Sequence, residues 1–400
     1  MLLAGLVTSS SQAPEAATAF IRSDQARFVR ELISLTEIPA PPFKEQARAA
    51  AFAGLLREAG LPTVETDAAG NVMALRKGTG KGLLVVNAHL DTVFPEGTNV
   101  NVKRQGTRLS APGVGDDTRG LALVLSLVRA MDAAHIETAS DILFVGNVGE
   151  EGEGDLRGIK YLLQKGRYHG HVTQMVAIDG GEVTGVTNAG VGSKRYRVTF
   201  TGPGGHSYGA FGLVNPAFAM GEAIARLSRL TVPSKPKTTF NVGVVRGGTS
   251  INAIPADVSM DVDLRSESCA ELKTLDAQFL TVVRAAVDAE NKARSTKEGP
   301  VTADPKVVGE RPCGETALSS PIVRAADAAI RAFGLTPSFT ISSTDANVPM
   351  SMGIPAITIG RGGPGGRQHS PDEWTDVDPA ANVKNEQVVL AIILAVAGRP

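Results

Sequence analysis

Seven side chains that could hold metal ions or move protons follow apolar runs that read as strands. Asp91 comes two residues after His89 in HLDTV, and Glu150 adjoins Glu151 in GNVGEEGEG. The others are Asp116 in PGVGDDTRG, Asp179 in AIDGG and His369 in RQHSPDE. Buried carboxylates without a cation cost on the order of several kcal/mol each. Because Arg and Lys are sparse in these motifs, we predict bound metal.

The residue types indicate which metal and which reaction. Histidine and carboxylate ligands suit zinc, with manganese or cobalt as alternatives, and two histidines with three carboxylates fit two ions that share a bridging carboxylate. Successive side chains of an extended segment point to opposite sides, so Glu150 and Glu151 can have separate tasks. One can bind metal while the other takes a proton from a metal-activated water. Asp91, at i+2 from His89, can orient that imidazole.

The elements that must position these residues are short buried strands and the helices between them. The strand candidates are KGLLVVNAHLD, SDILFVGNVGEE, QMVAIDGG and IPAITIGRGG. DDTRGLALVLSLVRAMDAA has apolar residues at helical spacing, with Asp117 or Thr118 as its N-cap. Alternating strands and helices predict parallel pairing, which brings sites together at the carboxyl ends of the strands.

The pattern changes at about Gly192. SKRYRVTFTG and ADVSMDVDLRS alternate apolar and polar residues, as half-exposed strands do, and two amphipathic helical segments accompany them. Buried runs return after about residue 312. We therefore predict a catalytic α/β domain over 1–191 and 312–400, and an inserted domain over 192–311 with an antiparallel sheet and two helices.

Composition limits the partners and the compartment. A formal net charge of -1 and 42% apolar residues favour a small-molecule substrate and give no sign of nucleic-acid or membrane binding. The N-terminal segment MLLAGLVTSSSQAPEA lacks a basic n-region, so we expect a soluble cytoplasmic protein; export is the alternative if the segment is a truncated signal peptide. Cys269 and Cys313 have no CxxC spacing, which predicts two buried thiols.

Seven motifs taken in order carry a resemblance to a known family. They are HLDTV, PGVGDDTRG, VGEEGEG, AIDGG, GGHSYG, SINAIPADVSMDVDLRS and RQHSPDE. They resemble the co-catalytic zinc metallopeptidases, which include peptidase T, glutamate carboxypeptidases, aminoacylases, acetylornithine deacetylase and succinyl-diaminopimelate desuccinylase, from about residue 25 to the end. The resemblance implies a zinc-exopeptidase-like fold: a mixed, mainly parallel sheet with flanking helices, plus an inserted α+β lid that forms a homodimer.

The resemblance also assigns roles to single residues. The ligand sets it implies are His89, Asp116 and Asp179 for one zinc, and Asp116, Glu151 and His369 for the other, with Asp116 bridging. Glu150 becomes the general base and acid, and Asp91 the orienting partner of His89. His206 becomes the stabiliser of the oxyanion, often in the partner subunit's site.

Asn252 and Arg265 resemble residues that bind a carboxylate or amide of the substrate. The alternative is a turn residue and a surface ion pair. The chain departs from many relatives at Thr118 and Arg119, which should not disturb the metal ligands.

The third ligand, Asp179, is an aspartate rather than a glutamate, and DGGEVTG is similar to peptidase T. Both features favour the aminopeptidase and di- or tripeptidase members. We therefore predict a di-zinc metallohydrolase of small peptides. One alternative is an N-acyl-amino-acid amidohydrolase or carboxypeptidase with the same site. A more distant one is a non-catalytic, metal-dependent binding protein.

Overall fold

The computed structural model describes residues 14–80 and 82–400, which form two compact units. One unit comprises the chain up to Gly190 together with Glu315–Pro400, and the inserted unit is Val191–Gly314. The inserted unit corresponds to the segment predicted over 192–311.

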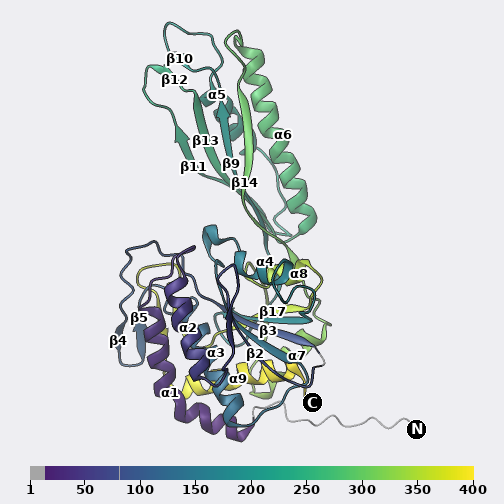
Figure 1. The fold of residues 1–400 in the computed structure, drawn as a ribbon. Helices are drawn as coiled ribbons and strands as arrows, with labels where there is room; N and C mark the ends of the chain where they lie inside the picture. Colours follow the sequence, from purple (N-terminus) through teal and green to yellow (C-terminus); the bar gives the residue numbers. More distant parts are fainter. Residues whose placement is uncertain (1–13, 81) are drawn as a thin grey trace, which may run out of the picture. The chain divides into compact units, whose positions relative to one another are not determined.

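A mixed sheet forms the centre of the catalytic unit (Figure 1). Its order is β1 (Val64–Thr66), β2 (Val72–Arg76), β6 (Asp141–Asn147), β3 (Leu83–His89), β7 (Gln174–Gly180), β17 (Ala356–Gly360), β8 (Gly185–Gly190) and β15 (Gly314–Glu315), while β16 (Ser338–Ser342) pairs with β8. The neighbours β6, β3, β7 and β17 are parallel, whereas β2 and β8 are antiparallel to their neighbours in this group. The prediction of a mixed, mainly parallel sheet is confirmed.

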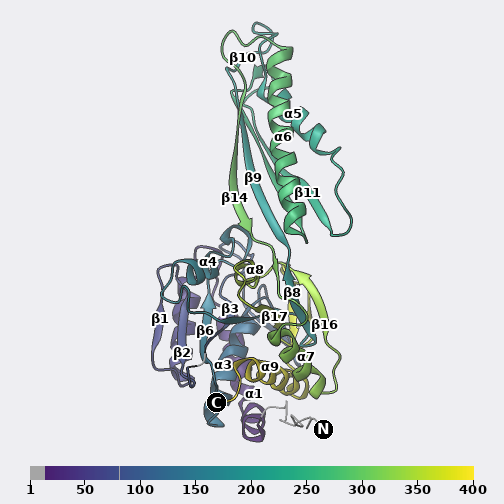
Figure 2. The ribbon, with the colours of Figure 1, turned by 90° about the vertical axis from the view of Figure 1, so that its right-hand side faces the viewer.

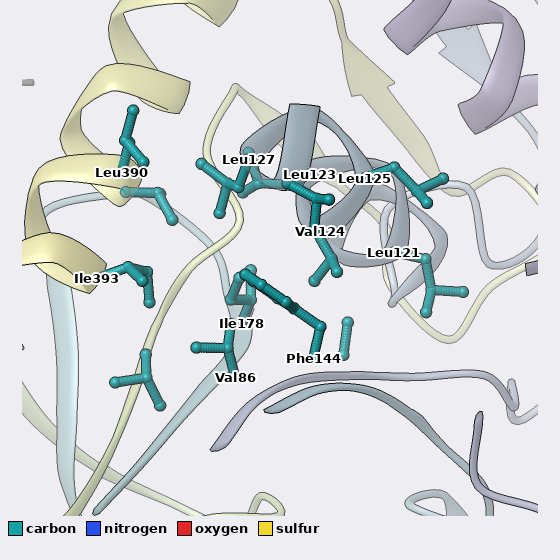
Figure 3. Packing of buried hydrophobic residues seen from close by; sticks show 14 of the residues in the cluster. Val86, Leu121, Leu123, Val124, Leu125, Leu127, Phe144, Ile178, Leu390 and Ile393 are labelled. Carbon is teal, nitrogen blue, oxygen red and sulfur yellow. The ribbon is translucent and has the colours of Figure 1, made fainter. Parts of the chain in front are cut away.

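Helices cover both faces of this sheet, as Figure 2 shows. One face carries α1 (Glu15–Thr36), α2 (Gln46–Glu58), α3 (Thr118–Ala133), α7 (Pro321–Ala332) and α9 (Pro379–Ala397), and the other carries α4 (Arg157–Gln164) and α8 (Asn347–Ser351). Alternate residues of β3 point to opposite faces of the sheet. Leu84 and Val86 pack under α3 and α9, whereas Leu83 and Val85 pack toward α4 and α8. Figure 3 shows the larger of these layers, with Val86, Phe144 and Ile178 of the sheet beneath α3 and α9.

The helix α9 is long and apolar enough to pass a test for membrane spans, and it is the only such helix among residues 14–80 and 82–400. Most of that apolar stretch is buried within the protein, where Leu390 and Ile393 have no exposed surface. Packing against α1, α3 and α7 explains its apolar composition, since a helix that is apolar all round is typical of a domain core.

The helix α3 begins at Thr118, with Asp117 as its N-cap. The Asp117 side chain makes no capping hydrogen bond to the helix; its Oδ2 instead accepts the backbone N–H of His89 at 3.0 Å. The start of the helix is thereby held against the end of β3.

A small four-stranded sheet lies beside the central one in the catalytic unit. Its order is β18 (Gly365–Gly366), β19 (Trp374–Asp376), β5 (Arg108–Ser110) and β4 (Lys103–Gln105). Pairing of β19 with β5 joins the segment that follows His369 to the segment that precedes Asp116. Two stretches that are far apart in the sequence thus share one ladder.

The inserted unit is an antiparallel sheet with two helices on one face. The strand order is β11 (Thr238–Gly247), β13 (Asp257–Ser266), β9 (Gly192–Thr201) and β14 (Thr302–Arg311), with the hairpin-like pair β10 (Gly205–His206) and β12 (Ala253–Ile254) beyond them. The helices are α5 (Pro216–Leu227) and α6 (Cys269–Ala293). Alternate residues of β13 are buried under these helices, as the sequence pattern predicts.

The prediction of two buried thiols is wrong, because Cys269 and Cys313 form a disulfide. Cys269 starts α6 and Cys313 follows β14, and their Cα atoms are 5.6 Å apart, within the usual range for a disulfide. The pairing depends on how α6 folds back along the sheet, which a separation of 44 residues does not reveal.

Candidate active site

The four parallel strands deliver the predicted site residues to one edge of the sheet. His89 is the last residue of β3, Asp179 is the penultimate residue of β7, and Glu150 and Glu151 follow β6. His369 lies between β18 and β19, in the segment that follows β17. Carboxyl ends of neighbouring parallel strands meet at one edge, so residues far apart in sequence become neighbours.

Asp116 lies between the two histidines. Its Oδ1 is 3.2 Å from His89 Nε2, and its Oδ2 is 3.2 Å from His369 Nε2. His369 Nε2 is also 2.9 Å from Glu151 Oε1, and His89 Nε2 is 3.7 Å from Asp179 Oδ1. The structure therefore brings all five predicted ligands together, with one oxygen of Asp116 facing each histidine.

The donor set fits divalent metal ions. In the part of the chain that the structure describes, two groups of three donors lie within 4.8 Å of one another: His89, Asp116 and Glu151, and His89, Asp117 and Asp179. Imidazole nitrogen with carboxylate oxygen is the donor chemistry of zinc and manganese sites. Asp117 Oδ1, which is buried and has no hydrogen-bond partner among the described residues, adds a further acceptor at this edge.

The predicted pairing of Asp91 with His89 takes a different form in the structure. His89 Nδ1 is 2.9 Å from the carbonyl oxygen of Asp91, while the Asp91 carboxylate is 3.7 Å away. Side chains at i and i+2 point the same way only in an extended chain, but β3 ends at His89. A carbonyl can only accept, so Nδ1 donates, and in the neutral imidazole Nε2 then carries the free lone pair that a metal needs.

The Asp91 carboxylate holds the loop that carries the two adjacent glutamates. It accepts the backbone N–H of Glu150 at 2.9 Å and that of Glu151 at 2.8 Å. The backbone of Glu151 is extended, which supports separate directions for the two side chains. Glu150 is 4% exposed and Glu151 7% exposed, so both carboxylates are buried.

Arg361 is a buried cation of the site that the sequence reasoning missed. Its Nη1 donates to the Asp179 carbonyl at 2.8 Å and to Asp179 Oδ1 at 3.0 Å, and it lies 3.4 Å from Asp116 Oδ1. The cluster therefore contains a cation that the sparse Arg and Lys of the sequence motifs did not predict. One guanidinium nevertheless faces Asp116, Asp117 and Asp179 together, so further positive charge is still required. The strand-end rule could have identified Arg361, because it directly follows β17.

The carboxylates and histidines shift one another's pKa. Burial would raise the pKa of Asp116, but Arg361, His369 and His89 hold it well below the usual range. Burial would lower the pKa of His89, but Asp116 and Asp179 raise it well above 6.5. Hydrogen bonds to Asp116 and Glu151 raise the pKa of His369 to about 10. In the metal-free protein, protonated His89 and His369 therefore supply the positive charge that metal ions would bring.

We expect zinc uptake by the metal-free protein at pH 7 to release protons and to strengthen as pH rises toward 10. Zinc binds neutral imidazole, whereas His369 with a pKa of about 10 is protonated at pH 7. Because this pKa is raised from 6.5, the stabilisation by the imidazolium is complete below about pH 6.5 and is lost as pH rises through 10. Calorimetric titration in two buffers of different ionisation enthalpy checks this; equal heats in both buffers would contradict it.

The structure places His206 and Asn252 together in the inserted unit. His206 is the last residue of β10 and Asn252 directly precedes β12, and the Asn252 carbonyl accepts the N–H of Ser207 at 2.9 Å. His206 Nδ1 accepts the N–H of Tyr208 at 3.3 Å and of Gly209 at 3.2 Å. Neutral His206 therefore carries its proton on Nε2, the atom that could donate to an oxyanion.

Arg265 lies at the other end of this unit. It pairs with Ser193 on β9, whereas Asp257, at the Asn252 end of β13, pairs with Thr201. Eight residues of strand separate the two positions, roughly 26 Å. Arg265 donates to Asp263 at 2.6 Å and is 42% exposed. Arg265 and Asn252 of one chain therefore cannot bind the same small group.

A cavity of about 190 Å³ adjoins the metal-ligand cluster. Its lining includes Gly115, Arg361, Gln368 and Glu373, which are sequence neighbours or contacts of Asp116 and His369. Space for a small group is therefore present beside residues that adjoin or contact Asp116.

Comparisons with known proteins agree with this geometry. The family model described as "Peptidase family M20/M25/M40" matches residues 85–394. Carboxypeptidase G2 of Pseudomonas sp. (strain RS-16) is 23% identical over 234 residues, which is 55% of this chain and 55% of that protein, so the chain spans about half of this curated relative.

Solved structures share the fold. Aminopeptidase PepT of Bacillus cereus superposes with a TM-score of 0.74 at 23% identity, covering 93% of this chain and 99% of that one. A tripeptidase of Staphylococcus aureus gives a TM-score of 0.74 at 22% identity, covering 93% of this chain and 98% of that one. With the family match extending over most of the sequence and including all five clustered ligand candidates, the chain belongs to peptidase family M20/M25/M40.

Proposed function

We propose that this protein is a metallohydrolase that cleaves peptide bonds of small peptides with two divalent ions, zinc in the first place and manganese or cobalt as substitutes. The observation that carries the proposal is Asp116, which faces His89 with one carboxylate oxygen and His369 with the other. A carboxylate in that position can bridge two ions. His89 and Asp179 would complete one site, and Glu151 and His369 the other.

When bound, the two ions polarise the scissile carbonyl and lower the pKa of water to about 7. Glu150 takes the proton of the attacking water and passes it to the leaving amine. Its position supports this role, because it adjoins the ligand Glu151 and is held by the same Asp91 carboxylate. Asp91 fixes this loop through its side chain and His89 through its carbonyl oxygen.

His206 donates from Nε2 to the oxygen that becomes negative during attack, and Asn252 binds a polar group of the substrate beside it. Arg265, which lies apart from both, would bind a different group or remain in its ion pair with Asp263.

We propose that the protein is a homodimer through the inserted unit, and that His206 and Asn252 serve the partner subunit's site. The strand β11 supports this interface, since it lies at the edge of its sheet and exposes Val244 and Val245. Unpaired edge strands are templates for pairing with a second chain. Sedimentation equilibrium tests the dimer, and a monomer at all concentrations would contradict it.

Free-amine peptides are the proposed substrates. Asp179 as third ligand and the fold shared with an aminopeptidase and a tripeptidase support this choice. The second candidate is a carboxypeptidase or an N-acyl-amino-acid amidohydrolase, because the curated relative is named a carboxypeptidase. Both use the same ligands and the same base.

One panel separates these candidates: tripeptides with a free amine, the same tripeptides acetylated, and acetylated or succinylated amino acids. We expect the zinc-loaded or manganese-loaded protein to release the N-terminal residue from the free tripeptides only. Faster cleavage of the acylated compounds would support the alternative. If neither metal gives turnover, a non-catalytic, metal-dependent binding protein is the candidate that remains.

The disulfide bears on the compartment. Disulfides are rare in reducing compartments, so Cys269–Cys313 favours the exported form over the cytoplasmic one. Alkylation of free thiols at the moment of cell lysis, followed by mass spectrometry, tests this; two alkylated cysteines would support a reducing compartment.

A further inference from the structure

Glu373 joins the loop that carries Asp116 to the loop that carries His369. It is 1% exposed and lies four residues after His369. Its Oε1 accepts the backbone N–H of Gly115 at 2.8 Å and of Asp116 at 2.7 Å, and its Oε2 accepts that of Gly113 at 3.0 Å. One carboxylate thus binds three N–H groups of the segment that presents the bridging aspartate.

The backbone strengthens the same connection. The carbonyl oxygen of Glu373 accepts the N–H of Ala111 at 3.1 Å, and the next residue, Trp374, pairs with Ser110. Gly115 allows the close approach, because a Cβ at this position would lie 2.9 Å from Glu373 Oε1. Glycine at 115 and glutamate at 373 therefore form a matched pair.

The position is costly for a carboxylate. Glu373 is 1% exposed and contacts Asp116, so its carboxylate gives up contact with water beside a second acid. An amide or an apolar residue would avoid this cost. The charge is best explained by what it holds, since the Asp116 carboxylate must face two histidines at 3.2 Å each.

We propose that Glu373 is a positioning residue for metal binding: it fixes Asp116 between His89 and His369 so that one carboxylate can serve two ions. This inference rests on the proposed function. It assigns to Glu373 no contact with substrate. Its effect acts through the N–H groups of Gly113, Gly115 and Asp116.

The test is a titration of the metal-free full chain with Co²⁺, followed by visible absorption, for Glu373→Gln and a matched control, Glu386→Gln. Glu386 is also 1% exposed, with a pKa raised to about 7 by burial, but it binds Ser126, Gln25 and Asn382 rather than the ligand loops. We expect Glu373→Gln to weaken cobalt binding by about 10- to 100-fold, the usual effect of losing a group that orients a ligand, and to change the absorption bands. Glu386→Gln should leave both unchanged.

Thermal unfolding of the metal-free variants separates positioning from general stability. We expect Glu373→Gln to weaken cobalt binding at temperatures where the metal-free variant is folded. If that variant does not fold, Glu373→Asp, which keeps the charge but shortens the reach, takes its place and should show the same direction of change. Cobalt affinity and absorption bands like those of the unsubstituted chain would overturn the inference.

The same titration distinguishes failure of the inference from failure of the proposed function. If the unsubstituted chain binds two cobalt ions and the Glu373 variants do so equally well, only the role of Glu373 is wrong. If the unsubstituted chain binds none, the metal site itself is wrong.

Discussion

Replacing Glu150 with Gln is expected to leave two metal ions bound while lowering kcat by about 10²- to 10⁴-fold, the usual contribution of a general base. Gln keeps the shape of the side chain but cannot take a proton from water. The metal ligands are unchanged, because the Asp91 carboxylate accepts the backbone N–H at 150 and not the side chain. Steady-state kinetics together with metal analysis of the same preparation give both quantities.

Glu153→Gln is the matched control for this variant. Glu153 is an exposed glutamate in the short 3₁₀ turn Gly152–Gly154 of the same loop. Its substitution should leave kcat and metal content unchanged. Turnover of Glu150→Gln close to that of the unsubstituted protein would exclude Glu150 as the base, whether or not the metals are bound.

Replacing Asp116 with Ala is expected to remove both ions and reduce activity to the background rate. Asp116 lies 3.2 Å from His89 Nε2 through one carboxylate oxygen and 3.2 Å from His369 Nε2 through the other. Without Asp116, Arg361 faces only Asp179 and Asp117. The positive charge of Arg361 then disfavours a metal ion beside these two carboxylates. Metal content per chain after dialysis against a fixed zinc concentration measures the effect.

Two further substitutions make the Asp116 result specific. Asp179→Ala should weaken one ion more than the other, because Asp179 approaches only His89 of the two histidines. Asp132→Ala, at an exposed position on α3, should change nothing. Retention of two tightly bound ions by Asp116→Ala would contradict a shared ligand.

The ends of the parallel strands could be predicted from the sequence because buried parallel strands have a clear signature. Apolar runs followed by Gly, Asn or Asp located β3, β6, β7 and β17, and topology alone then required His89, Glu151 and Asp179 to meet. The start of α3 was also predictable, since Asp117 precedes a helical pattern.

Contacts between loops could not be predicted in the same way. Arg361 and Glu373 belong to segments that were recognised for other residues. Their partners Asp179 and Gly115 lie 182 and 258 residues earlier in the chain, and periodicity gives no signal for contacts over such separations. His89 contacts the carbonyl of Asp91 rather than its carboxylate because β3 ends at His89. The disulfide could not be predicted from the sequence. Spacing rules describe short motifs, whereas the fold brings Cys269 and Cys313 together from distant positions.

Asp345 shows the same limit. It is buried, accepts the side-chain N–H groups of Asn87 at 2.8 Å and Asn147 at 2.7 Å, and has its pKa raised by burial to about 7. Asn87 and Asn147 lie in β3 and β6, whereas Asp345 follows β16, so the cluster exists only once the sheet is assembled.

Anomalous diffraction at the zinc absorption edge, from crystals of the zinc-loaded protein, would show whether two ions share Asp116. We expect two peaks in each chain, one in contact with His89, Asp116 and Asp179, and the other with Asp116, Glu151 and His369. A single peak, or peaks that Asp116 does not contact, would exclude a shared ligand.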